Sequence, residues 1–301
     1  MINRLKVNIF DKNLIVQFKS VVSLLVGVLT TILIFKDIPQ KYKNYCFIAF
    51  VILLIIIYLV LWVRSNTIKR VELNINNSKM EIEQGDIFEQ DGLKVIAFNE
   101  FFDTEVSDRL ISDKTLNGIY LKNIVSDVNK LDLDIENDQY LSKNIIEKNV
   151  QRAEGKSTRY ELGSIYKRDD YLLTAFSKFD EYNRAYLTIK DYNNFLINFW
   201  KEIDKIYNAE NISIPLLGSN ITRFKECNLS DQQLLELLIW SFKLSKFSNS
   251  NSSKVSIVVH KKTMDKINLY KLKTLFYYYF KSCGYKVRRE YLWLLVFYKI
   301  K

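Results

Sequence analysis

An uncharged apolar run, YCFIAFVILLIIIYLVLWV, extends over 19 residues from Tyr45 to Val63. A helix needs about 20 mostly apolar residues to cross a bilayer, and uncharged runs of this length are rare in soluble cores. A first run, residues 14–35, is uncharged from Ser20 onward, and Lys19 lies close enough to its end to reach the headgroups. The two runs predict a transmembrane helical hairpin within residues 1–70, with spans at about 14–35 and 45–63.

Two alternatives exist for these runs, a signal peptide and a buried pair of soluble helices. No A-x-A-like cleavage site follows the first run, and the second run begins within ten residues of it, which favours the hairpin. The hairpin carries no acidic or basic side chain in mid-membrane, as an ion carrier would. We therefore expect an anchor, or an element that acts by oligomerising.

The basic charge of the chain is concentrated beside these runs. Residues 1–70 hold ten Lys or Arg and two acids, whereas the remainder holds 34 bases and 32 acids. Seven of the ten bases flank the outer ends of the hairpin and three lie in the connecting turn, which predicts a multi-pass inner-membrane protein with both termini cytoplasmic. Because residues 1–70 carry most of the net charge of +10, we expect a lipid bilayer and no nucleic acid as partner.

The remaining residues, 71–301, alternate strand and helix patterns. Strands are predicted at 71–75, 80–82, 93–98, 159–166, 171–176, 211–217 and 254–260, and helices at 121–130, 139–149, 188–207, 229–245 and 264–282. This order predicts an α/β domain with a largely parallel sheet. The single histidine and the three cysteines, which form no CxxC pair, exclude a two-imidazole site and make a zinc site or a disulfide framework unlikely.

Three predicted strand ends carry residues suited to ligand binding. They are Gly85-Asp86-Ile87, then Asn99 with residues 101–104, and then residues 218–224, GSNITRF. Ligands of such sheets lie beyond the carboxyl ends of the strands, and loops rich in backbone donors bind phosphate oxygens. The alternatives are a plain turn at Asp86, a helix cap at Asn99 and an ordinary strand-to-helix connection at 218–224.

The three segments together resemble a macro domain, the ADP-ribose-binding fold, through GDIFEQDGLKVIAFNEFFDT and SIPLLGSNITRF. The resemblance implies a macro-like three-layer α/β/α domain with a mixed sheet. It implies that Asp86 accepts a hydrogen bond from the adenine amino group, with the Ile87 backbone near the base and Asn99 near the distal ribose. Residues 218–223 would wrap the diphosphate, and Phe224 would line the nucleotide. The candidate ligand-binding residues are Asp86, Ile87, Asn99, Phe102, Asp103, Thr104, Asn117, Gly118, Gly218, Ser219, Asn220, Ile221, Thr222, Arg223 and Phe224, without a catalytic residue, metal or cofactor.

The order of hairpin and macro-like domain resembles the membrane-anchored macro-domain effectors of Thoeris anti-phage defence. That resemblance implies an ADP-ribose-derived signal, such as histidine–ADP-ribose, made by a TIR-domain enzyme that consumes NAD. It also implies a homo-oligomer that disrupts the membrane and arrests the infected cell. Ordinary macro domains follow the Asn with a glycine tract, whereas here the first glycine after Asn99 is Gly118. This departure argues against ADP-ribosyl hydrolase activity, which is the alternative function, and a plain membrane scaffold is a third.

Three further features of the sequence are less informative about function. Residues 261–301 hold eleven bases among many aromatic side chains, which favours a last helix and strand with a basic solvent face over contact with a membrane surface. His260 follows an apolar strand, which favours a structural or solvent-facing role. Cys227 has no sequence signature of a nucleophile.

Overall fold

The computed structural model describes residues 5–75, 78–107, 109–180, 182–219, 222–226, 228–245 and 253–282. The predicted ligand residues Asn220 and Ile221, Cys227, and the basic aromatic stretch beyond residue 282 lie outside the described residues. The chain divides into two compact units, Met1–Val71 with Ile267–Lys301, and Glu72–Lys266.

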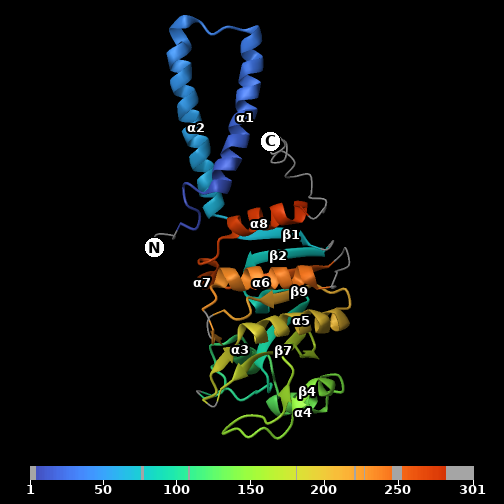
Figure 1. Cartoon of the computed structure of the whole chain (residues 1–301). Coiled ribbons are helices and arrows are strands. Elements are labelled where there is room, and N and C mark those ends of the chain that lie inside the picture. Colours follow the sequence, from blue (N-terminus) through green and yellow to red (C-terminus); the bar gives the residue numbers. More distant parts are fainter. Residues whose placement is uncertain are drawn as a thin grey trace. The chain divides into compact units, whose positions relative to one another are not determined.

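The first unit contains the helical hairpin, drawn in blue in Figure 1: α1 (Lys12–Phe35), the short 3-10 helix η1 (Gln40–Tyr42) and α2 (Lys43–Asn66). Asp11 caps α1, because its Oδ1 accepts hydrogen bonds from the Asn13 and Leu14 amides at 2.9 and 3.2 Å. The two helices are long and apolar enough to cross a membrane, and their apolar side chains are mostly exposed. They cover both predicted spans.

The hydroxyl side chains of α1 donate hydrogen bonds within the helix itself. Ser23 donates to the Lys19 carbonyl at 2.8 Å, Thr30 to Val26 at 2.9 Å and Thr31 to Gly27 at 2.8 Å. Such bonds to the preceding turn let hydroxyl groups lie in an apolar environment without a partner helix. These hydroxyl groups therefore need no hydrogen-bond partner from a neighbouring helix.

The end of the hairpin away from η1 is held by the N-terminal residues. Trp62 Nε1 donates to the Val7 carbonyl at 3.0 Å, and Asn66 Oδ1 accepts from the Lys6 and Val7 amides at 2.8 and 2.9 Å. In the same unit, α8 (Leu269–Ser282) contributes Tyr270, which donates to Gln17 Oε1 at 3.2 Å. Tyr270 and Phe276 are buried, so the first aromatics of the basic stretch are core residues, as the sequence favours.

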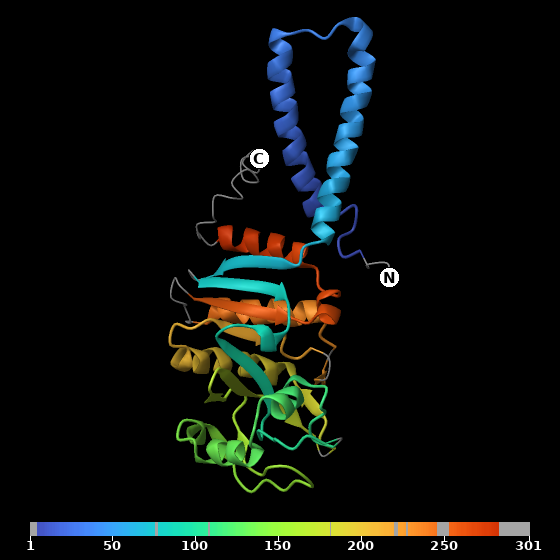
Figure 2. The same cartoon turned by 180° about the vertical axis from the view of Figure 1, so that it is seen from behind.

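The second unit is built on a mixed sheet, seen from behind in Figure 2. Its strands run in the order β1-β2-β11-β9-β3-β7-β8-β10, with β6 also paired to β7. Pairs β2–β11, β11–β9, β9–β3, β3–β7 and β8–β10 are parallel, and β6–β7 and β7–β8 are antiparallel. The strands are β1 (Arg70–Ile75), β2 (Ser78–Gln84), β3 (Leu93–Asn99), β6 (Ile165–Arg168), β7 (Tyr171–Phe179), β8 (Ala185–Leu187), β9 (Ile212–Pro215), β10 (Arg223–Phe224) and β11 (Lys254–Val259).

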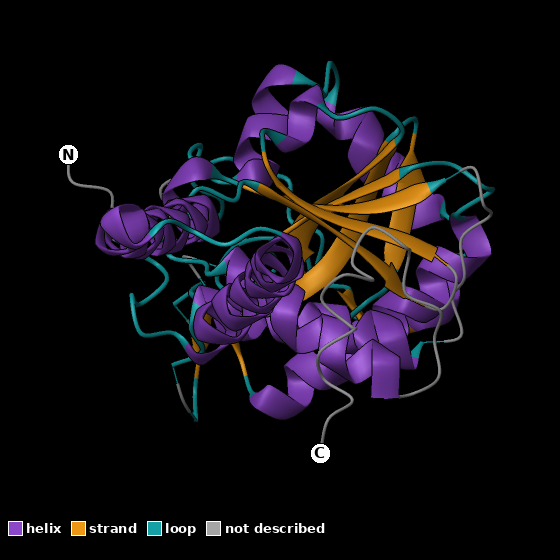
Figure 3. Cartoon of the chain, turned by 90° about the horizontal axis from the view of Figure 1, so that it is seen from above, coloured by secondary structure: helices purple, strands orange, loops and turns teal. Residues whose placement is uncertain are grey.

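Helices lie on both faces of this sheet (Figure 3). On one face, α3 (Leu116–Asn123) and α4 (Val128–Asn137) pack through Tyr120 and Leu131 against Ile96 and Phe98 of β3. On the other face, α5 (Ile189–Ile206) and α6 (Asp231–Leu244) join an aromatic chain that begins at Phe176 of β7. Its members are Phe176, Tyr192, Phe195, Phe199, Trp200 and Phe242. The three-layer arrangement agrees with the prediction.

Several predicted elements differ from the observed ones. The helix predicted at 121–130 is interrupted, because Asp127 caps a new helix, α4, by accepting the Lys130 amide at 3.0 Å. The helix predicted at 139–149 is wrong: residues 141–144 form the 3-10 helix η3 (Leu141–Asn144), and β4 (Ile145–Glu147) follows. β4 pairs with β5 (Arg159–Tyr160) in a separate two-stranded sheet. The helix predicted at 264–282 begins later than predicted, as α8 at Leu269, and the short helix α7 (Lys261–Met264) precedes it.

Candidate functional site

The carboxyl ends of the parallel strands meet at one edge of the sheet. Gln84 pairs with Val259, Pro215 with Val258, and Asn99 with Ser177, and these residues belong to five strands, β2, β11, β9, β3 and β7. A cavity of about 1120 Å³ opens beyond them and is lined by residues of β11, β9, β3 and β7 and by Gly85, which follows β2. Small-molecule sites occupy roughly 300–1,000 Å³, so the cavity has room for an extended nucleotide-sized ligand.

Asp86 lies on the cavity wall directly after β2. Its Oδ1 accepts a hydrogen bond from the Phe88 amide at 3.0 Å and caps the 3-10 helix η2 (Ile87–Glu89). The side chain is exposed, and among the described residues Oδ2 has no hydrogen-bond partner. Ile87 is buried beside it and also lines the cavity. One carboxylate oxygen therefore orders the turn while the other can accept a hydrogen bond from a ligand.

Asn99 forms the opposite wall at the end of β3. Its Oδ1 accepts hydrogen bonds from the Phe101 and Asp103 amides at 3.0 and 3.2 Å, and its Nδ2 donates to Asp103 Oδ2 at 2.8 Å. These bonds fold residues 99–103 into a tight turn in which Phe102 adopts a positive φ of 50°. The adjacent Glu100 is buried, and burial raises the pKa of its carboxyl although the Arg159 guanidinium lies 3.7 Å away.

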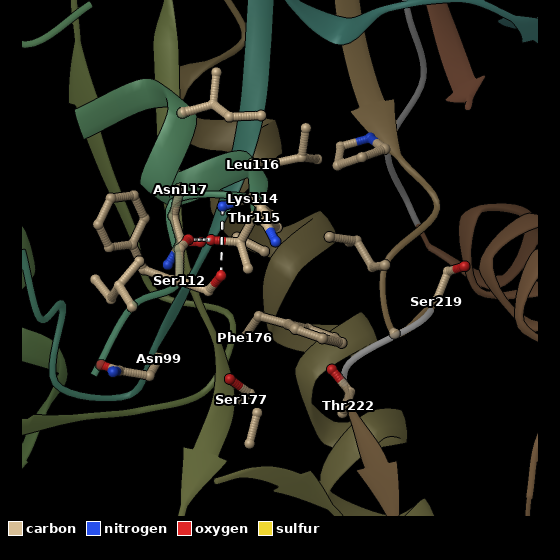
Figure 4. Close-up of a pocket in the computed structure, with 18 of the residues that line it drawn as sticks. Asn99, Ser112, Lys114, Thr115, Leu116, Asn117, Phe176, Ser177, Ser219 and Thr222 are labelled. Carbon is tan, nitrogen blue, oxygen red and sulfur yellow. Dashed lines mark hydrogen bonds between the residues drawn. The ribbon is translucent and has the colours of Figure 1, made fainter. Parts of the chain in front are cut away.

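The loop after β9 forms a third part of the wall. Gly218 adopts a φ of 90°, which L side chains rarely adopt, and the Ser219 amide donates to the Leu216 carbonyl at 3.3 Å. Ser219 Oγ donates to Asp231 Oδ1 at the start of α6 at 2.8 Å. Thr222 and the exposed Arg223 also line the cavity. Figure 4 shows Ser219 and Thr222 across the cavity from Asn99, Ser112 and Asn117.

Residues 109–117 form a further part of the wall. Leu110 and Ile111 are buried, and the Ser107 amide donates to the Ile111 carbonyl at 3.1 Å. The segment thereby has its own apolar anchor and contributes Arg109, Ser112, Lys114, Thr115 and Asn117 to the cavity wall.

The charges on the cavity wall are predominantly positive. Of the residues that the structure describes, five cationic side chains line it, Arg109, Lys114, Arg184, Arg223 and Lys262, against two acids, Asp86 and Glu154. Arg109 pairs with Glu154 at 2.6 Å and Arg184 with Asp180 at 2.8 Å. Among the described residues, Lys114, Arg223 and Lys262 form no ion pair, which suits them to an anionic ligand. Within the same part of the chain, no group of His, Cys, Asp and Glu could hold a metal ion.

Of the candidate residues named from the sequence, eight line the cavity: Asp86, Ile87, Asn99, Asn117, Gly218, Ser219, Thr222 and Arg223. Their contact with a ligand stays a prediction.

Five other candidates are not among the residues that line the cavity, and a role for them in ligand binding stays a prediction. Phe102 is buried in the apolar core, and Asp103 is 1% exposed and paired with Arg152 at 2.9 Å. Thr104 donates to Asp132 Oδ1 at 2.7 Å. A Cβ on Gly118 would lie 2.2 Å from the Ser112 carbonyl oxygen, so this glycine allows close packing of the backbone. Phe224 packs edge-on against Tyr192.

Sequence reasoning missed several residues of the wall. Phe176 enters it because β7 has an extra residue opposite Phe98 and Asn99, and such a bulge redirects a side chain. Arg109, Glu154 and Asn183 come from loops that give no periodic signal. His260 and Lys262 follow β11, so the rule on strand ends could have identified them. His260 also caps α7 by accepting the Lys262 amide at 3.3 Å, as its predicted structural role requires.

Comparison with known proteins adds sequence similarity to this geometry. The family model described as "Thoeris protein ThsA, Macro domain" matches residues 80–260, more than half of the chain. The Thoeris protein ThsA of Bacillus amyloliquefaciens (strain Y2) is 41% identical over 249 residues, covering 81% of this chain and 83% of that protein.

Two solved structures of the Oceanobacillus iheyensis macrodomain are also similar. A mutant is 14% identical with a TM-score of 0.45, covering 69% of this chain and 94% of that chain. The macrodomain with ADP is 12% identical with a TM-score of 0.44, covering 71% and 97%. On the family match and the 41% identity, the chain belongs to the Thoeris ThsA macro-domain family.

Proposed function

We propose that this protein is a membrane effector of anti-phage immunity whose macro domain binds an ADP-ribose-derived signal, histidine–ADP-ribose. A TIR-domain enzyme that consumes NAD supplies the signal. Binding shifts the protein toward a homo-oligomer, and the hairpins then disrupt the inner membrane and arrest the infected cell. Residues 71–301 act as the sensing domain and residues 1–70 as the membrane element.

The observation that carries this proposal is the cationic cavity at the carboxyl ends of the sheet. Arg223 begins β10, Lys262 lies in α7, and both line the cavity, where a diphosphate would gain charge-assisted hydrogen bonds. Asp86 offers an acceptor oxygen at another part of the wall, suited to an exocyclic amino group of a base. Family membership supports a ligand of the ADP-ribose type.

The membrane part of the proposal is supported by two long apolar helices with exposed apolar side chains. Both termini lie in the cytoplasm because seven of the ten basic residues near the hairpin flank its outer ends. A ligand shifts an assembly equilibrium only if it binds one assembly state more tightly than another. The signal must therefore bind the homo-oligomer more tightly than the unassembled protein.

Calorimetric titration of the full chain in detergent micelles tests the ligand. We expect binding of ADP-ribose, and tighter binding of histidine–ADP-ribose. Lys262→Ala and Arg223→Ala should each weaken both by about ten- to a hundredfold, since each removes a charge-assisted hydrogen bond. Lys130→Ala, an exposed lysine of α4 away from the cavity, is the control and should bind as the unmodified chain does. A folded chain that binds neither ligand would refute the proposal.

Two further measurements separate the effector from the alternative, a membrane-tethered ADP-ribosyl hydrolase. Mass spectrometry should recover the ligand intact after incubation, whereas release of free ADP-ribose from the conjugate would favour the hydrolase. Dye-loaded vesicles that contain the full chain should leak when the conjugate is added, with cross-linked oligomers appearing at the same ligand concentration. Leakage without ligand would contradict signal-dependent action.

A further inference from the structure

One ion pair forms part of the cavity wall. Arg109 Nη1 lies 2.6 Å from Glu154 Oε1, and both side chains line the cavity. The side chains are 78% and 32% exposed, so a ligand can reach either of them. They come from segments separated by 45 positions in the sequence, the 107–112 loop and the 150–157 loop.

The backbone that carries each charge is anchored. In the first of these segments, residues 109–112 are held by buried Leu110 and Ile111. The 150–157 loop is held by the buried carboxylate of Asp103, which accepts hydrogen bonds from the Lys156 amide at 2.7 Å and from Arg152 Nη2 at 2.9 Å. Gly155 fits against this carboxylate only because it lacks a Cβ, which would lie 2.6 Å from Asp103 Oδ1.

The same contacts place Glu154 at the Asn99 end of the cavity. Glu154 precedes Gly155, which packs on Asp103, and Asp103 accepts a hydrogen bond from Asn99 Nδ2 at 2.8 Å. Arg152 Nη2 also donates to Asn183 Oδ1 at 3.3 Å, which joins the loop to another segment of the wall. The opposite charges of the pair are thus presented from fixed supports at one end of the cavity.

A charge pair in this position selects among ligands by the charges that they bring. A neutral group displaces neither partner, so the ion pair between Arg109 and Glu154 stays intact. A group with one charge replaces one partner and leaves the other cavity-facing charge without its own partner. A zwitterionic group gives Arg109 and Glu154 each a new partner of opposite charge, so the ion pair can be exchanged without leaving a charge unpaired.

We propose that Arg109 and Glu154 are a specificity-determining pair for a zwitterionic group, an α-amino acid moiety, at the distal end of the ligand. Arg109 binds the carboxylate in two parallel hydrogen bonds, as its planar guanidinium allows, and Glu154 binds the ammonium group. This inference rests on the proposed ADP-ribose-type ligand. It adds the residues that distinguish a conjugated signal from plain ADP-ribose.

Titration of the full chain in detergent with ADP-ribose and histidine–ADP-ribose tests the pair. Arg109→Gln and Glu154→Gln should each weaken conjugate binding by about tenfold or more and leave ADP-ribose binding within about twofold. Lys167→Gln removes an ion pair of similar exposure, to Glu210 at 3.4 Å, that does not line the cavity, and should change neither affinity. The carboxyl methyl ester of the conjugate should bind the unmodified chain weakly, with no further loss in Arg109→Gln.

Two results would overturn this inference while the proposed function stands. One is unchanged preference for the conjugate in both variants. The other is an equal loss of both ligands, which would mean that the pair shapes the cavity without recognising the distal group. Failure of the unmodified chain to bind either ligand would overturn the proposed function itself and this inference with it.

Discussion

Replacing Asp103 by alanine leaves a buried guanidinium without its counter-charge. Asp103 is 1% exposed and accepts hydrogen bonds from Asn99 Nδ2 and the Lys156 amide at 2.8 and 2.7 Å. It also accepts from Arg152 Nη1 and Nη2 at 3.1 and 2.9 Å, and the Arg152 side chain is 9% exposed. The guanidinium lies 3.9 Å from the centre of the Phe101 ring, which holds it in place after the carboxylate is lost.

Removing one partner of a buried ion pair costs about 3–5 kcal/mol. Total stability is about 5–15 kcal/mol for a typical domain, so Asp103→Ala removes a large share of it. At about 2–4 °C per kcal/mol for a unit of this size, the unfolding temperature should fall by roughly 6–20 °C.

Thermal unfolding of the full chain in detergent, followed by the fluorescence of buried Trp200, measures this loss. Asp113→Ala is the matched control, since its ion pair with Lys122 at 3.2 Å is half exposed and is worth at most about 1 kcal/mol. Adding Arg152→Met to Asp103→Ala should restore part of the loss, because the unpaired charge is gone. An Asp103→Ala cost no larger than that of the control would refute the reasoning, as would a double variant less stable than the single one.

Two other predictions concern packing and pH. Gly118→Ala should destabilise the protein by about 1–3 kcal/mol and weaken ligand binding, since its Cβ would meet backbone atoms of Ser112 and Asp113 beside the cavity. Gly27→Ala, which meets nothing within 4 Å, is the control, and equal melting temperatures would contradict the packing argument. Burial raises the folded-state pKa of Glu100 above its ordinary 4.5, so the unfolding free energy should fall as pH rises through that folded-state value. Glu100→Gln should lack this slope in denaturant titrations, and parallel pH profiles would exclude the assigned cause.

The elements that the sequence predicts well are those whose signals are local. The continuous apolar run of β3 and the apolar strand β11 are found where predicted, as is the amphipathic helix α5. α5 begins after Thr188, whose side chain accepts the Asp191 amide in a capping box. The strand at 145–147 could not be predicted in this way, because it exists only through pairing with β5.

In the candidate site too, the sequence predicts the residues that have a local signal and misses those that depend on distant contacts. Residues at strand ends, such as Asp86, Asn99 and Gly218, follow from the rule that ligands lie beyond the carboxyl ends of the sheet. Asp103 was predicted as a ligand residue, yet its carboxylate holds Arg152, which lies 49 positions later in the chain. No local pattern reveals such a pairing, so neither the ion pair of Asp103 nor the position of Glu154 on the cavity wall could be predicted.

The cavity wall draws on segments from Gly85 to Thr263, so nearly every loop at this edge of the sheet must be in place before the wall is complete. Domains are synthesised from the N-terminus, and β11 with His260 and Lys262 leaves the ribosome after all the other wall segments. A nascent or truncated chain that ends before β11 therefore lacks part of the cavity wall. A ligand that fits this wall stabilises only the finished molecule.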